Sequence, residues 1–149
     1  MIDSEKMAKE AVALFDSGYN CSESMLLAFS RAMGIECAAF PMVATALGAG
    51  MGRLCQECGV LTGGILAIGL MYGRSKANET DRRDRSYAVA RVYYGDFRKG
   101  FGSVKCIEIQ GTDLLNQEEA QKTAKERHAL CDKVVAEGAR ILVKLFQQK

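Results

Sequence analysis

Proline and aromatic residues are scarce in this chain of 149 residues, and neither basic nor acidic residues are in large excess. It has one proline, 7% aromatic residues, and 20 basic against 18 acidic side chains. A single proline excludes a collagen-like chain, and nearly balanced charge provides no whole-chain field for nucleic acid or anionic lipid. Because 48% of the residues are hydrophobic, a chain of this length can bury a core without disulfide bonds. We therefore expect a single domain over residues 1–149 that binds no nucleic acid.

A long apolar run and an export signal are also missing. The longest apolar stretch, residues 60–72, is shorter than the roughly 20 residues that a bilayer-spanning helix needs. The first residues have no basic start followed by an apolar block. We expect a cytoplasmic protein without membrane insertion, where thiols are normally reduced. Its six cysteines then favour metal ligation or transient redox disulfides over a static disulfide framework.

Alanine is frequent, and this favours helices over strands. The chain has 19 alanines against 16 valines and isoleucines together. Apolar residues recur at helical spacing in several segments. The stretch from about Gly59 to Met71 is apolar on every side, as in a helix at the centre of a bundle. We therefore predict an all-α bundle of about five to seven helices around this buried, glycine-containing helix.

Capping residues predict where several helices begin and end. Ser4 can cap the first helix, and Asn20 with Glu23 forms a capping-box pattern before the second. Ser103 can cap a short helix after a long one that ends near Phe97. The chain from about residue 116 is predicted to form one long helix or two broken ones.

Glycines cluster before and within the predicted central helix. Residues 48–52 are expected to form a flexible or tightly turned segment. Gly59 with Gly63, and Gly69 with Gly73, lie one helical turn apart, so that another backbone can approach closely. Each glycine costs about 1 kcal/mol relative to alanine in a helix interior, and close packing or a ligand must offset this cost. The partner helix can belong to the same chain or to a second copy, which would form a homodimer.

Cys55 and Cys58 form a C-x-x-C pair where the glycine-rich segment leads into the central helix. Helix N-terminal amides favour a thiolate, but the helix dipole contributes only about 0.3–1 kcal/mol. Ionisation at neutral pH therefore also needs N–H hydrogen bonds or a cation, for which Arg53 is the nearest candidate. A zinc ribbon needs a second pair and a thioredoxin-like site needs a preceding strand, and the sequence offers neither. Cys55 is either the local partner of Cys58 or a bystander.

Other cysteines also fall near predicted helix ends. Cys21 and Cys106 lie close to helix starts, and Cys131 follows an expected break around His128. If these ends converge, the thiols form a cluster surrounded by backbone donors. His128 lies three residues before Cys131, which suits a Cys–His site, although its charged neighbours favour a solvated surface. For Cys37 we expect inert core packing.

Four cysteine segments carry a family resemblance. They are Tyr19-Asn20-Cys21, Cys58-Gly59-Val60-Leu61-Thr62-Gly63, the segment FGSVKC at residues 101–106, and Cys131 before a final amphipathic helix. Their order resembles the family of putative redox-active proteins named for its C, GCAxxG, C and C pattern, over nearly the whole chain. The resemblance implies functional roles for Cys21, Cys58, Cys106 and Cys131, with Cys37 and Cys55 as additional residues. Val60 stands where the motif Cys-Gly-Ala-x-x-Gly of this family has alanine.

These observations favour a thiol redox protein, such as a thiol-disulfide oxidoreductase, and leave two alternatives. In the favoured interpretation Cys58 attacks, and one of Cys21, Cys106 or Cys131 resolves the mixed disulfide. Its partner is a redox protein or a small molecule, and dithiol chemistry needs no cofactor. The first alternative is a protein that binds zinc or an iron–sulfur cluster through the same four cysteines. The second is a helical interaction module whose cysteines are only structural.

Overall fold

The computed structural model describes residues 1–148, which form nine helices and no strand. The all-α fold expected from composition and periodicity is therefore confirmed. The long helices are α1 (Ser4–Asp16), α2 (Cys21–Ala32), α5 (Gly59–Tyr72), α6 (Thr80–Phe101) and α9 (Ala124–Gln147). The short ones are α3 (Met42–Thr45), α4 (Gly48–Met51), α7 (Cys106–Gln110) and α8 (Gln117–Lys122). The difference from the expected five to seven helices lies in these short elements.

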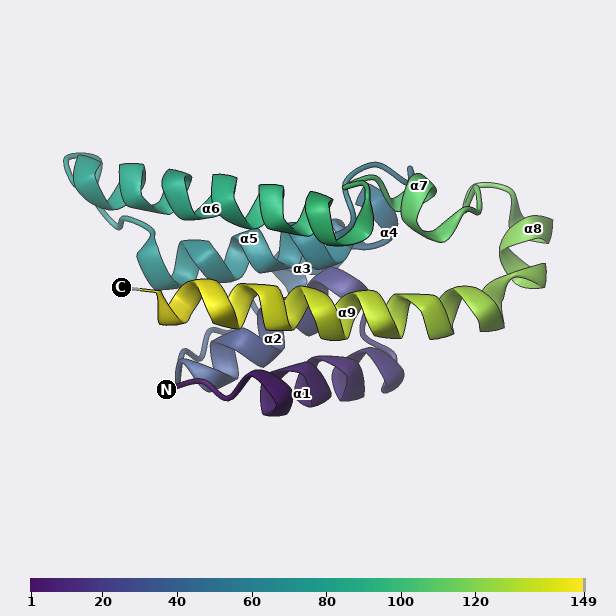
Figure 1. The fold of residues 1–149 in the computed structure, drawn as a ribbon, viewed down its shortest axis with the longest axis horizontal. Coiled ribbons are helices and arrows are strands. Elements are labelled where there is room, and N and C mark those ends of the chain that lie inside the picture. The colour runs from purple at the N-terminus through teal and green to yellow at the C-terminus, as the bar shows by residue number, and fades with distance from the viewer. Residues whose placement is uncertain (149) are drawn as a thin grey trace.

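The long helices pack as a bundle around α5. Helix α5 contacts α2 on one side and α6 on another, and α9 packs against α1, α5 and α6 (Figure 1). Leu61, Ala67 and Ile68 of α5 are completely buried, so the prediction of a buried central helix is confirmed. Helix α9 runs along most of the molecule, and its first turns extend beyond the other long helices toward α8 (Figure 1). The candidate site lies at this end.

Glycines on α5 allow close approach on one half of the helix only. A Cβ atom on Gly63 would lie 2.5 Å from the Ser22 carbonyl oxygen of α2, and one on Gly59 would overlap the Cys21 sulfur. The predicted close packing is confirmed for this pair. It is wrong for Gly69, which has no neighbouring atom within 4 Å, and for Gly73, which follows the end of α5.

Several helix ends differ from the sequence prediction. The α2 capping box of Asn20 is present as expected, but α1 is capped by Asp3, whose carboxylate accepts from the Lys6 N–H at 2.6 Å. Helix α6 continues to Phe101 instead of ending near residue 97, because the residue that adopts the left-handed conformation and ends the helix is Gly102 (φ 75°). Ser103 does not cap α7, since Lys105 occupies the N-cap position.

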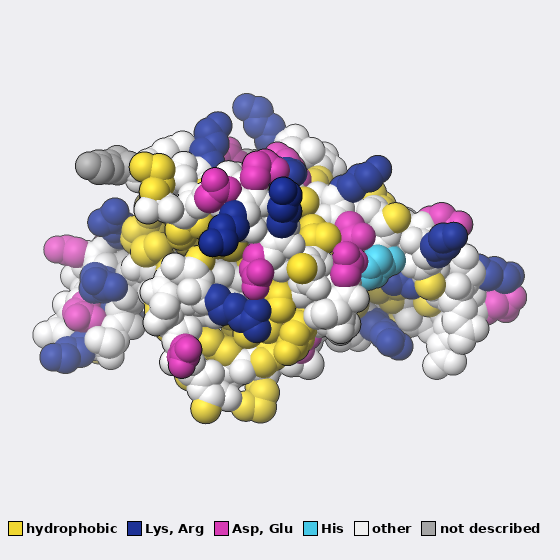
Figure 2. Space-filling view, turned by 90° about the horizontal axis from the view of Figure 1, so that it is seen from below, with side chains coloured by type: hydrophobic (Ala, Val, Ile, Leu, Met, Phe, Trp, Pro, Cys, Tyr) yellow, Lys and Arg dark blue, Asp and Glu magenta, His cyan; other side chains and the backbone are white. Residues whose placement is uncertain are grey.

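The surface mixes charges of both signs. In the view of Figure 2, basic and acidic side chains alternate over the face that it shows. The single histidine lies there beside acidic groups, and His128 Nε2 is 2.8 Å from the Asp16 carboxylate. Within residues 1–148, none of the helices combines the length and hydropathy needed to span a membrane.

Candidate functional site

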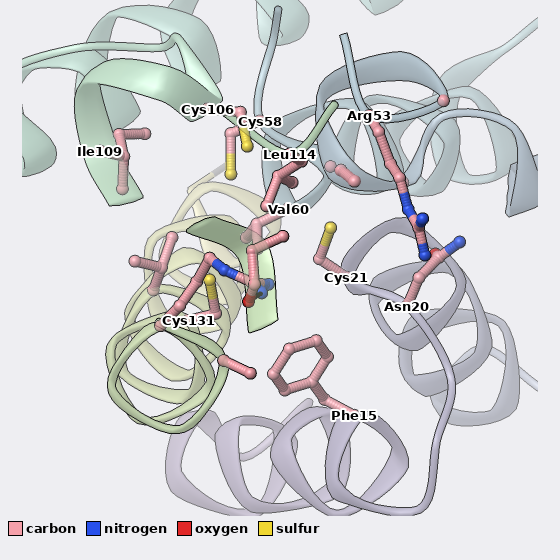
Figure 3. Close-up of a pocket in the computed structure, with 18 of the residues that line it drawn as sticks. Phe15, Asn20, Cys21, Arg53, Cys58, Val60, Cys106, Ile109, Leu114 and Cys131 are labelled. Atoms are coloured by element: carbon pink, nitrogen blue, oxygen red, sulfur yellow. Dashed lines mark hydrogen bonds between the residues drawn. The ribbon is translucent and has the colours of Figure 1, made fainter. Parts of the chain in front are cut away.

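Four cysteines from four helical segments line one cavity of about 700 Å³. Figure 3 shows their side chains around the space between α2, α5, α7 and α9. Cys58 and Cys106 are buried, Cys21 and Cys131 are half-buried, and all are free thiols. The four thiols therefore converge on one space, a point that the sequence alone left open. The four are Cys21, Cys58, Cys106 and Cys131.

Cys21 is fixed by the start of α2. Asn20 caps this helix by accepting from the Glu23 N–H, and its Nδ2 donates to the Thr45 carbonyl at 2.9 Å. The buried Ser22 hydroxyl donates to the Ala44 carbonyl at 2.7 Å. These two bonds attach the first turn of α2 to α3, so the Cys21 side chain is held at the cavity wall.

Cys58 and Cys106 are placed by a short antiparallel contact. Glu57 and Lys105 form an isolated bridge, and their side chains make an ion pair at 2.8 Å. The Cys58 N–H donates to the Val104 carbonyl at 2.8 Å, and the Cys106 N–H donates to the Gln56 carbonyl at 2.6 Å. Because side chains alternate along extended backbone, Cys58 and Cys106 lie on the face opposite the ion pair. Both thiols consequently face the buried side.

Cys131 comes from a helix interior, which corrects the expectation of a fourth helix end. The break between α8 and α9 lies at Thr123, and the chain is continuous helix through His128 and Cys131. Only Cys21, Cys58 and Cys106 are at helix starts: Cys58 is the N-cap of α5, and the other two are first helical residues.

The glycine-rich segment before α5 is a left-handed turn. Residues 49–53 all have positive φ, including the non-glycine residues Ala49 (56°), Met51 (67°) and Arg53 (70°). Left-handed backbone costs L-residues other than glycine roughly 1–2 kcal/mol each. Two backbone hydrogen bonds close the turn. The Cys55 N–H donates to the Ala49 carbonyl at 3.2 Å, and the Gln56 N–H donates to the Gly50 carbonyl at 2.9 Å. This strained segment forms one wall of the cavity through Gly48, Ala49, Gly52 and Arg53.

The packing around α5 accommodates Val60, although the family that the chain resembles has alanine at this position. Gly138 of α9 lies directly opposite, and a Cβ atom on this glycine would overlap a Val60 methyl group. The Tyr93 hydroxyl of α6 donates to the carbonyl oxygens of Val60 and Gly138, at 3.3 and 3.4 Å. A small residue on α9 thus accommodates the larger side chain beside Cys58.

Burial raises the pKa of every cavity thiol. For Cys131 the pKa reaches about 11, because burial and the charge of an ionised Cys21 outweigh the attraction of the Arg127 guanidinium. For Cys106 it reaches about 12, because burial acts together with the nearby Cys55 and Cys21. Arg127 precedes Cys131 by one helical turn, and that spacing is the sequence signal that could have identified it.

The conditions that the sequence set for ionisation of Cys58 are not met in the free thiol. Burial and the neighbouring Cys21 raise the pKa of Cys58, although the backbone N–H groups of Val60 and Leu61 oppose the rise. Arg53 does not supply the expected cation, since its guanidinium extends toward Asn20 at the cavity edge (Figure 3). The helix amides are in place, as predicted, but desolvation is the larger effect.

Cys21 lies in the most polar backbone environment of the four. Burial raises the pKa of Cys21, and four backbone N–H groups oppose the rise. Its ionised form also raises the pKa of each of the other three thiols, so Cys21 is the neighbour that they share. The opposing N–H groups belong to Ala49, Ser22, Gly59 and Cys21 itself.

The remaining candidates lie outside the cavity wall. Cys37 is exposed, so the expectation of core packing is wrong for it. Cys55 is buried in a small cluster with Cys106 and Leu114, and its sulfur is 3.6 Å from the Thr112 carbonyl oxygen. His128 is half exposed and stacks on Phe15 at 4.6 Å between ring centroids. It pairs with Asp16 and not with Cys131.

The comparison with known proteins agrees with the cysteine pattern. The sequence profile of the family described as "Putative redox-active protein (C_GCAxxG_C_C)" matches residues 19–145, which include all four cavity cysteines. No curated protein and no solved structure matches the chain. The chain therefore belongs to the C_GCAxxG_C_C family of putative redox-active proteins.

Proposed function

We propose that this protein is a thiol redox protein whose cavity cysteines cycle between dithiol and disulfide. The observation that carries the proposal is that four thiols from distant parts of the chain line one cavity. Thiol-disulfide exchange needs an attacking thiol, a resolving thiol and access for the substrate. The free thiols of the cavity can take the first two roles, and its volume of about 700 Å³ leaves room for a small substrate.

Cys131 is better suited to attack than Cys58, the residue favoured by sequence. Cys131 is half-buried, whereas Cys58 is buried. Arg127 lowers the pKa of Cys131 and so favours its thiolate, whereas no cation acts in this way on Cys58 or Cys106 among their main influences. Because the thiolate is the nucleophile, we assign the first step to Cys131.

Cys21 is the candidate resolving thiol, because Cys21 and Cys131 are the two half-buried thiols of the cavity, whereas Cys58 and Cys106 are buried. In the first step the Cys131 thiolate attacks a substrate disulfide, forms a mixed disulfide and releases one thiolate. In the second step Cys21 loses its proton and attacks the Cys131 sulfur. This releases the second substrate thiolate and leaves a Cys21–Cys131 disulfide. Two electrons and two protons pass from the protein to the substrate.

Mass mapping of the reduced and oxidised protein tests this assignment. Reduced protein is mixed with bis(2-hydroxyethyl) disulfide under argon, quenched in acid and digested, and the linked peptides are identified. We expect a loss of two hydrogens and a Cys21–Cys131 link that dithiothreitol reverses. Cys131→Ser should abolish the link, whereas the matched control Cys37→Ser, at an exposed position outside the cavity, should leave it unchanged. A protein in which no pair of cavity cysteines becomes linked would refute the proposal.

A metal or iron–sulfur centre is a second candidate, favoured by the chemistry of the same donor set. Four thiolates are a complete ligand set for zinc or a cluster, and a bound cation would offset the burial and mutual repulsion that raise the thiol pKa values. Within residues 1–148, however, no three cysteine sulfurs lie within 4.8 Å of one another. A tetrahedral zinc site, with Zn–S bonds of about 2.3 Å, needs sulfurs about 4 Å apart.

Anaerobic purification distinguishes the two candidates. Metal analysis and a visible absorption spectrum of the purified protein are compared with those of Cys58→Ser. A stoichiometric metal that disappears in this variant supports the second candidate. Metal-free protein that undergoes reversible dithiol oxidation supports the first.

A further inference from the structure

The cavity wall carries positive charge without any negative charge. Two of its lining residues are Arg53 and Arg127, and among the described residues that line it there is no aspartate or glutamate. This is unusual in a chain that has 18 acidic residues. Some arginines elsewhere on the molecule do pair with carboxylates, as Arg31 does with Glu10 and Arg140 with Glu5.

Neither cavity arginine has a carboxylate partner within the described part of the chain. Arg127 donates from Nη2 to the Ala120 carbonyl at 2.8 Å, and its Nε is buried without a hydrogen-bond partner. A buried donor left unpaired costs roughly 1–3 kcal/mol, and more when the group is charged. Arg53 is exposed, and its guanidinium reaches the cavity edge beside Asn20 (Figure 3). The two guanidinium groups are therefore available to a ligand.

The size of the cavity limits what this ligand can be. A volume of about 700 Å³ falls in the range of small-molecule sites, which is about 300–1,000 Å³. The side-chain amides of Asn20, Gln117 and Gln121 line the same space and can donate to an anion. Guanidinium groups bind carboxylates through paired N–H donors.

We propose that the cavity binds a small disulfide that carries carboxylate groups, with Arg53 and Arg127 as its anion-binding residues. This inference rests on the thiol redox function proposed above and adds the substrate class. The substrate disulfide accepts two electrons and becomes two thiols, while two cavity cysteines lose two protons and form a disulfide. Arg127 serves both the substrate and the attacking Cys131, since it lies one turn before Cys131 on α9.

Three probe disulfides of similar size and different charge test the proposal. They are dithiodiglycolate, which carries two negative charges, neutral bis(2-hydroxyethyl) disulfide, and cystamine, which carries two positive charges. Thiol loss in the reduced wild-type protein is followed under argon by quenching and mass measurement. Each rate is divided by the rate of the same probe with 2-mercaptoethanol, which removes differences in intrinsic reactivity. We expect the normalised rate for dithiodiglycolate to exceed that for the neutral probe about tenfold, and cystamine to be slowest.

Arginine variants locate the effect. Arg127→Gln and Arg53→Gln should each reduce the advantage of dithiodiglycolate over the neutral probe several-fold, and Arg127→Lys should retain part of it. Arg98→Gln, at an exposed position of α6 away from the cavity, is the matched control and should change nothing. Adipate, a dicarboxylate without a disulfide bond, should slow the reaction of dithiodiglycolate in the wild type and not in Arg127→Gln.

The outcomes separate this inference from the proposed function. If all three probes oxidise cavity cysteines with equal normalised rates, the anionic substrate is wrong and the thiol redox function stands. The same conclusion follows if the arginine variants slow all probes equally. If no probe links any pair of cavity cysteines, the redox function itself fails, and the inference fails with it. Circular dichroism of each variant checks that the substitution leaves the helical fold intact.

Discussion

Single side chains show how burial and local charge compete at the cavity. Helix N-termini surround Cys21 and Cys58 with backbone N–H donors, yet burial keeps the pKa of both thiols above the usual value. A thiolate that loses its water needs either a cation or several hydrogen bonds to recover the lost solvation. The resting protein therefore holds these cysteines as protonated thiols. Ionisation depends on groups such as Arg127 or on a bound ligand.

The pH dependence of Cys131 alkylation follows from its pKa of about 11. Because iodoacetamide reacts with the thiolate, we expect the rate at Cys131 to rise about tenfold per pH unit from pH 8 to 10.5 without levelling. Arg127→Gln removes the cation that favours the thiolate and should lower the rate at each pH. Peptide mass spectrometry measures the rate, with Arg98→Gln as control. A plateau below pH 9 would contradict the raised pKa.

Among the helices, α5 depends most on glycine, and its two ends use glycine differently. At its amino-terminal end Gly63 allows α2 to come into backbone contact, which brings the Cys21 and Cys58 segments together. At its carboxyl-terminal end Gly69 is exposed and has no neighbouring atom within 4 Å. The same residue type is thus required by packing at one position and only lowers helix propensity at the other.

Alanine substitutions at these two positions should act in opposite directions. A Cβ atom on Gly63 would meet the backbone of Ser22, which cannot move without displacing α2. We expect Gly63→Ala to lower the free energy of unfolding by about 1–3 kcal/mol. Gly69→Ala should raise it by up to about 1 kcal/mol, because alanine is the better helix former. Urea unfolding followed by circular dichroism measures both, and equal effects would rule out the close contact between α2 and α5.

The molecule as a whole is a helical bundle with a cysteine-lined cavity at one end. The main core draws its buried residues from all five long helices, whereas a small separate cluster of Cys55, Cys106 and Leu114 lies beside the cavity. The cavity forms where the first turns of α2, α5 and α7 meet the amino-terminal half of α9. A stable bundle can therefore hold strained backbone and buried thiols at one end without loss of the core.

Raised thiol pKa values make the folded state sensitive to alkali. Between the ordinary thiol pKa of 9.0 and the folded value of about 11, folded Cys131 keeps a proton that the unfolded chain loses. The unfolded state then binds fewer protons, so stability falls as pH rises through this window. We expect a contribution of at most about 2 kcal/mol from Cys131, reduced because it is partly exposed. Urea unfolding from pH 8 to 10.5 should show a shallower decline for Cys131→Ser than for the wild type, and parallel declines would refute this linkage.

Much of the fold followed from local patterns, whereas the family resemblance singled out the four cysteines that line the cavity. Helical periodicity, the Asn20 capping box and an all-apolar α5 depend on interactions between residues that are close in sequence, and these were predicted correctly. The end of α6 was placed near Phe97, a few residues too early, because the glycine whose left-handed backbone ends the helix is Gly102. The exposed position of Cys37 was missed as well, because residue type gives only an average preference for burial.

The order of residues along this chain determined most helices and the Asn20 cap, because these depend on neighbours within a few positions, and it also carries the four cysteines of the family pattern, which the resemblance identified. Only the tertiary structure decided that the four thiols share a cavity, that α9 contributes Cys131 from its interior, and that Arg127 and Arg53 face the same space. Thiol pKa values also depend on tertiary structure, since burial and charges from other helices set them. Solvation and electrostatic interactions act through space between segments far apart in the chain, and spacing within one segment carries no information about them.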